Sequence, residues 1–251
     1  FGATSGTKTI TSNGKTMDFP VTFNGVGGTW QLQDAMTLGS ARTGTLTNGT
    51  IDLFGKTLTV GTRFTTATGT KNITFNGGTL VCPDPNTTSF NNAAPTNFTT
   101  TAGTGTGTIS MTAATAKTFV GGGSTYNCTL NQGGAGALTI TGSNTFNNIT
   151  NTTQPASVLF TAATTNTFNN FSLSGTAGNL ITIGSVTAAQ HTLSKSSGTV
   201  SVSYCTISYS NATGGATWNA FTANGNVDGG NNTGWTFAAV VAAIGNFLMF
   251  F

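Results

Sequence analysis

The chain has 251 residues, a formal net charge of +3 and only 5% charged side chains, against about a quarter in an ordinary globular domain. It contains no Glu and few Lys or Arg, the usual helix-forming surface residues, which excludes a mainly helical fold. The few basic residues form no cluster that could neutralise phosphates, so no nucleic-acid partner is expected.

Strand and turn formers dominate instead. Thr makes up about a fifth of the chain, and its branched side chain favours strands. Asn makes up about a tenth and Gly occurs 35 times, and both tolerate the positive φ of tight turns. Because 37% of the residues are hydrophobic and 18 are Phe, an ordered core is expected rather than disorder.

The first half of the chain already shows strand patterns. Apolar and polar residues alternate in "GTIDLFGKTLTV" (Gly49–Val60) and in "KNITFNGGTLV" (Lys71–Val81). The "FGKT" within the first stretch lacks the Gly spacing of a phosphate-binding loop, so it predicts a turn between two strands. "GTGTGT" (Gly103–Thr108) matches no nucleotide-binding pattern and predicts a turn or strand.

A degenerate repeat follows in the second half. "TYNCTL" (Thr125–Leu130), "TFNNIT" (Thr145–Thr150) and "TFNNFS" (Thr167–Ser172) follow one another at steps of 20 and then 22 residues. A further step of 22 from Phe171 predicts that Leu193 occupies the next equivalent position. In a second series, the same step leads from Leu159 to Ile181.

A period of this length is typical of stacked-repeat folds, and the near-absence of helix formers leaves a parallel β-solenoid with coils of about 20–22 residues. Repeats of β-sandwich domains are the alternative. In a solenoid, equivalent residues of successive coils superimpose, so aromatic rings stack and side-chain amides bond from coil to coil. The predicted ladder residues are Phe146, Asn147, Asn148, Phe168, Asn169, Asn170, Phe171 and Leu193.

The sequence pattern changes after residue 203, where the repeat is no longer recognisable. We expect solenoid rungs over 1–203, a capping region over 204–237 that carries Trp218 and Trp235, and an apolar tail over 238–251. A cap is expected because the last coil of a stack exposes an unpaired strand edge. The tail is too short to span a bilayer, so we expect it to contact other subunits or to plug the core, with membrane contact as the less favoured reading.

Two stretches of the expected cap carry a resemblance. "SNATGGATW" (Ser210–Trp218) and "DGGNNTGWTF" (Asp228–Phe237) resemble closing segments of repetitive β-solenoid proteins of phage virions and bacterial surfaces. The resemblance is strong over about 30 residues here and extends to the rest of the chain only in style. It implies an exposed structural or adhesive protein, and it implies no reaction.

The residues offer little for catalysis. Asp34 and Asp52, 18 residues apart, are the best candidates for the paired carboxylates of a glycan-cleaving enzyme, but only five acids are present and none supports them. The single histidine, His191, has no triad context and is expected to be exposed or part of a ladder. "DGGNNTG" (Asp228–Gly234) is expected to be a turn rather than a cation site. Neither a cofactor nor a metal is therefore expected.

The three cysteines, Cys82, Cys128 and Cys205, lack metal-ligand spacing. Buried thiols are the leading expectation, and one disulfide remains an alternative.

These features together predict a structural and adhesive subunit of a virus particle, namely a phage fibre, spike or decoration protein on the virion exterior. It would form a homo-oligomer, with a trimer preferred, contact other virion proteins and bind cell-surface glycans by many weak contacts. The alternatives are a bacterial surface adhesin or filament subunit, and a polysaccharide hydrolase or lyase.

Overall fold

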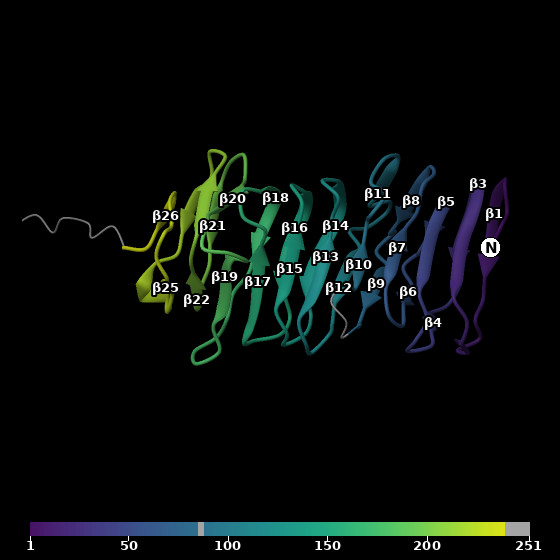
Figure 1. Cartoon of the computed structure of the whole chain (residues 1–251), viewed down its shortest axis with the longest axis horizontal. Coiled ribbons are helices and arrows are strands. Elements are labelled where there is room, and N and C mark those ends of the chain that lie inside the picture. Colours follow the sequence, from purple (N-terminus) through teal and green to yellow (C-terminus); the bar gives the residue numbers. More distant parts are fainter. Residues whose placement is uncertain (85–87, 239–251) are drawn as a thin grey trace, which may run out of the picture.

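The computed structural model describes residues 1–84 and 88–238. It is an all-β parallel solenoid of about 10 turns, with ~22 residues per turn, and the coils stack along the long axis from the N-terminal end to the C-terminal end (Figure 1). The only helical element in the described residues is one 3-10 turn, η1 (Thr222–Asn224). The predicted solenoid is therefore confirmed, and the β-sandwich alternative is wrong.

Every strand pair in the described residues is parallel and joins one coil to a neighbouring coil, except for one isolated antiparallel bridge within a loop. The largest sheet contains thirteen strands: β1 (Gly6–Ile10), β3 (Val21–Leu32), β5 (Gly44–Asp52), β7 (Phe64–Thr66), β8 (Lys71–Thr74), β10 (Phe90–Asn91), β11 (Phe98–Thr101), β13 (Lys117–Val120), β15 (Leu138–Thr141), β17 (Ala156–Phe160), β19 (Ile181–Ser185), β22 (Cys205–Ile207) and β25 (Val227–Asp228).

Two smaller sheets complete the solenoid. The ten-stranded sheet contains β2 (Thr16–Met17), β4 (Met36–Leu38), β6 (Thr57–Thr59), β9 (Thr79–Cys82), β12 (Thr108–Met111), β14 (Thr125–Gln132), β16 (Thr145–Asn151), β18 (Thr165–Ser172), β20 (His191–Ser194) and β23 (Ser210–Thr213). The three-stranded sheet contains β21 (Thr199–Ser201), β24 (Thr217–Asn219) and β26 (Trp235–Thr236).

The strand pairings define three faces along the axis. The first face starts with the beginnings of β3 and β5 and continues through β7, β10, β13, β15, β17, β19, β22 and β25. The second face contains β1, the ends of β3 and β5, β8 and β11, and then the starts of β14, β16 and β18, followed by β20 and β23. The third face contains β2, β4, β6, β9 and β12, the ends of β14, β16 and β18, and β21, β24 and β26.

Inward-facing side chains form columns along the axis. Phe64, Phe90 and Phe119 are register partners on the first face, and their rings stack with centroid distances of 5.7 and 4.5 Å. On the second face Phe146 stacks on Phe168 at 5.7 Å with an interplanar angle of 13°, as the repeat predicts. These rings are at most 1% exposed, so each coil buries a large apolar area against the next one.

Residues with positive φ, most of them Gly or Asn, form the corners. In the "FGKT" stretch, Phe54 and Gly55 have φ values of 46° and 73° and connect β5 to β6. In the next coil Asn76 and Gly77, at 47° and 80°, connect β8 to β9 at the equivalent corner. Gly and Asn are the residues that adopt this left-handed conformation most readily, and the predicted turn at "FGKT" is confirmed.

The strict 22-residue step fails after β18. Leu193 lies opposite Asn166 rather than Phe171, because the step between these register partners is 27 residues (193 − 166) instead of ~22. The second series also slips: Leu159 pairs with Gly184, while Ile181 pairs with Ala156. Both predicted alignments are wrong, because corner loops of variable length change the coil length while the strands stay in contact.

The predicted capping region contributes strands to all three sheets: β22 and β25 end the largest sheet, β23 ends the second sheet, and β24 and β26 end the third. Trp218 and Trp235 are register partners, with ring centroids 5.0 Å apart, and both rings contact Phe171 edge-on. The predicted tail 238–251 lies outside the described residues except for Ala238. Within the described stretches, no helix is long and apolar enough to cross a membrane.

The aromatic columns predict a large asymmetry between two adjacent residues of β13. Phe119→Ala removes a ring that contacts Phe90, Tyr126 and Phe146, and it is expected to lower the free energy of unfolding by about 3–5 kcal/mol. Thr118→Ala, on the outer side of the same strand, is the matched control and should change it by about 0.5 kcal/mol or less. Chemical denaturation followed by circular dichroism measures both, and equal effects would contradict the stacked core.

Candidate functional site

The outer surface of the solenoid carries ranks of hydroxyl and amide groups. On the second face one rank crosses five successive coils, with the register partners Thr7, Thr29, Thr50, Asn72 and Thr99. On the third face another rank consists of Thr57, Thr79, Thr108 and Thr129. Neighbouring members of a rank are separated by the strand spacing of about 4.8 Å.

Side-chain amides bond between coils as the repeat predicts at one position. Asn169 donates from Nδ2 to Oδ1 of Asn147 at 3.2 Å. Asn148 and Asn170 lie opposite each other in the register, but Oδ1 of Asn148 is buried and accepts no hydrogen bond from the described residues. One amide ladder is therefore formed, and the other is aligned without a bond.

The two candidate carboxylates are held by different donors. Asp34 accepts hydrogen bonds from the Ser12 backbone N–H at 2.8 Å, from the Ser12 hydroxyl, and from the backbone N–H of Asn13 at 2.7 Å. The bond from the Ser12 backbone N–H is the main reason why the pKa of Asp34 is lowered, and the other bonds act in the same direction. A general acid for glycoside cleavage requires a raised pKa instead.

Asp52 is 8% exposed and accepts from Gln31 Nε2, from Asn76 Nδ2 and from the backbone N–H of Phe54, at 2.8–2.9 Å. These bonds tie Asp52 to the coil before it and the coil after it. Asp34 and Asp52 therefore sit in the environments of structural carboxylates, and no hydrogen bond among the described residues joins them as an acid–base pair.

His191 differs from its prediction. Its side chain is fully buried and stacks on Phe160 with ring centroids 4.8 Å apart, rather than lying exposed or in an amide ladder. Neither ring nitrogen has a hydrogen-bond partner in the described residues. Burial lowers the pKa of His191 to about 4, because the charged imidazolium would lose its hydration. The sequence reasoning missed this because the coil length changes before β20.

Two lysines, Lys71 and Lys117, are buried in the solenoid, and sequence reasoning identified neither. Lys117 is 1% exposed, and its Nζ donates to the carbonyl oxygens of Ala113, Gly134 and Gly136 at 2.9, 3.3 and 2.7 Å. Burial lowers the pKa of Lys117 to about 8, while the three carbonyls act in the opposite direction because they accept bonds from the ammonium form. The only sequence feature that could have predicted the burial of Lys117 is its inward position in the alternating pattern of the "KTFV" strand.

The cysteines and the predicted turn follow expectation. All three cysteines are buried and free, and no cluster of metal-binding side chains occurs within 1–84 and 88–238. Asp228 accepts from the backbone N–H of Gly230 at 2.9 Å and from Nδ2 of Asn232 at 2.7 Å, so "DGGNNTG" forms a turn closed by its own carboxylate.

The second face has one interruption in its backbone pairing. β11 pairs only with β8, and the next coil reaches it through side chains. Asn127 donates from its backbone N–H to the Thr100 hydroxyl and from Nδ2 to the Thr100 carbonyl oxygen, both at 2.7 Å. The ladder of the second face is therefore bridged here by one amide and one hydroxyl.

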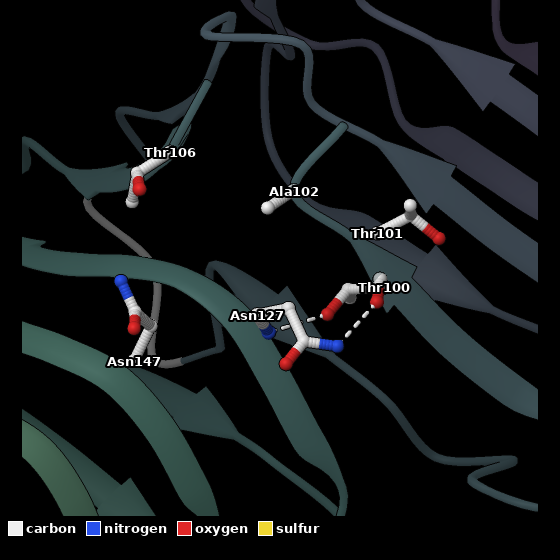
Figure 2. Close-up of a pocket in the computed structure, with 6 residues that line it drawn as sticks. All are labelled: Thr100, Thr101, Ala102, Thr106, Asn127 and Asn147. Carbon is white, nitrogen blue, oxygen red and sulfur yellow. Dashed lines mark hydrogen bonds between the residues drawn. The ribbon is translucent and has the colours of Figure 1, made fainter. Parts of the chain in front are cut away.

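This interruption opens a hollow of about 270 Å³, somewhat smaller than pockets that hold drug-sized ligands. Figure 2 shows its six lining residues, with Thr106 and Asn147 at the left, Ala102 near the middle, and Thr101 and Thr100 at the right, where Asn127 is bound to Thr100. In the described residues no donor binds Oδ1 of Asn127, and Nδ2 of Asn147 binds no acceptor. The hollow therefore presents a free acceptor and a free donor, and no ionisable group lines it.

Comparisons of the chain with protein-family models, with curated proteins and with solved structures find no match.

The burial of His191 predicts that the folded protein becomes less stable as the pH falls. In the unfolded chain its pKa is about 6.5 and in the folded chain it is about 4, so between these pH values only the unfolded state takes up the proton. The free energy of unfolding therefore falls as pH decreases through this window, by about 3 kcal/mol in total for this one group. His191→Phe keeps a ring against Phe160 and should lose this part of the slope. Denaturation midpoints at pH 7, 5.5 and 4 measure it; parallel slopes in the two proteins would contradict the assignment.

The three carbonyl oxygens that accept hydrogen bonds from Lys117 give a prediction about stability. Lys117→Met keeps most of the buried apolar stem but leaves carbonyl oxygens without their donor, and it should lower the free energy of unfolding by about 2–4 kcal/mol. The control is Lys8→Met on the exposed side of β1, for which a change of about 0.5 kcal/mol or less is expected. Thermal and urea denaturation distinguish the two; similar stability of both variants would show that these hydrogen bonds contribute nothing.

Proposed function

We propose that this chain is a structural and adhesive subunit of a virus particle, a phage fibre, spike or decoration protein that contacts cell-surface glycans. The observation that carries the proposal is the combination of a rigid stacked core with an almost uncharged outer surface of hydroxyls and amides. Such a surface forms many weak hydrogen bonds with a polyhydroxylated partner, and several copies together bind firmly by multivalency.

The core suits a mechanical role. Successive coils contact each other through backbone hydrogen bonds on two or three faces and through stacked rings inside, so local opening must break several contacts at once. The donors around Asp34 and Asp52 serve a structural purpose, which favours adhesion over glycan cleavage. A closed symmetric homo-oligomer is expected, and a homotrimer is preferred by analogy with fibres of this style.

The location of the protein tests the proposal. Antibodies raised against the purified chain are expected to decorate the exterior of virus particles in negative-stain electron micrographs, at symmetry-related positions. Analytical ultracentrifugation of the purified protein should give three times the chain mass of 25.3 kDa. Label on bacterial cell envelopes in the absence of particles would instead support a surface adhesin.

A further inference from the structure

Three hollows lie in succession along the second face. The first, of about 360 Å³, lies over β3, β5, β8 and Thr99 of β11. The second, of about 420 Å³, includes Thr99 and reaches Thr100 and Asn127. The third is the hollow of Figure 2, which also includes Thr100 and Asn127. Thr99 lines the first and second hollows, and Thr100 and Asn127 line both the second and the third, so neighbouring hollows adjoin. Together we call them the groove; its lining comes from strands β3 to β16, over five strand spacings, roughly 24 Å.

The lining of this groove is electrically neutral. Lys71 is the only ionisable residue that lines any of the three hollows. Its side chain is 1% exposed, and its Nζ donates to the carbonyl oxygens of Gly69 and Thr96 at 2.6 and 3.0 Å. A nucleic acid or another polyanion would find no free cation here to neutralise it, so the groove favours an uncharged occupant.

The groove is also a poor acceptor for an added peptide strand. Strand addition requires a free edge of backbone N–H and C=O groups. At the gap beside β11 the Thr100 carbonyl is already bound by the Asn127 side chain, and the Thr100 hydroxyl is bound by the Asn127 backbone. What the groove offers instead is hydroxyls, free amide groups and small apolar spots such as Ala102 and the 65% exposed Val26.

Hydroxyl, amide and small apolar groups match the alternating O–H and C–H surfaces of a sugar chain. We infer that this groove is the glycan site of the protein and that it takes an extended neutral polysaccharide, with the free Oδ1 of Asn127 and Nδ2 of Asn147 binding sugar hydroxyls in the third hollow. The inference rests on the proposed adhesive function and assigns it to one of the three faces.

Blocking the groove tests this assignment. Thr106→Trp narrows the third hollow and Thr125→Trp the second; both residues are exposed, so the fold should persist, as circular dichroism and thermal midpoints will show. The matched control is Thr139→Trp, an outward Thr on β15 of the first face. Affinity electrophoresis measures binding of the full chain to neutral glucans, mannans and galactans, with alginate as the anionic counterpart. Both groove variants should bind the preferred neutral polymer roughly tenfold more weakly, while the control binds like the unaltered protein.

Each other result contradicts a different part of the inference. If the unaltered protein and all three variants bind a polymer equally, the protein binds glycans but the assignment of the glycan site to the groove is wrong. If alginate binds and the neutral polymers do not, the neutral occupant is wrong. If no polymer binds the unaltered protein, both the groove and the adhesive part of the proposed function fail, while the virion location is still decided separately by the labelling experiment.

Discussion

The whole structure depends on parallel backbone pairing between successive coils. Because equivalent strands lie about 4.8 Å apart, side chains at the same position of neighbouring coils are brought into contact whatever their type. Inside, this places Phe119 on Phe90 and Phe168 on Phe146; outside, it aligns hydroxyls and amides in ranks. One geometric constraint therefore produces both the cohesive core and the regular polar surface.

The same constraint explains how polar and charged groups are accommodated. A side chain that points inward cannot reach water, so Lys117 binds three corner carbonyls and Asn144 donates to Oδ1 of Asn166 in the next coil at 3.1 Å. His191 has no such partner among residues 1–84 and 88–238 and remains neutral through its low pKa. The corners, where backbone carbonyls are free of the strand ladders, thus provide the partners for buried cations.

The second and third hollows of the groove lie where the constraint is locally relaxed. Between β11 and β14 the direct backbone ladder is replaced by the Asn127–Thr100 bridge, and the surface becomes hollow instead of flat. Longer corner loops accompany this break, including the "GTGTGT" stretch that carries Thr106. A binding site of this kind needs no catalytic constellation, which agrees with the structural contacts made by Asp34 and Asp52.

Composition and periodicity predicted the solenoid, the Phe146–Phe168 stack, the Asn147–Asn169 bond and the turn at "FGKT", because these features depend on residue type and a locally constant step. The step itself varies with corner length, and for that reason Leu193 was aligned with Phe171 and His191 was placed outside the core. The groove lies beyond sequence reasoning altogether, since it unites Val26, Asn127 and Asn147 from distant coils. The sequence by itself determined that the coils stack and that their surface is rich in hydroxyls and amides and poor in charge. Only the tertiary structure decided which residues face each other and where the stack opens, because loop lengths set the register of each coil independently.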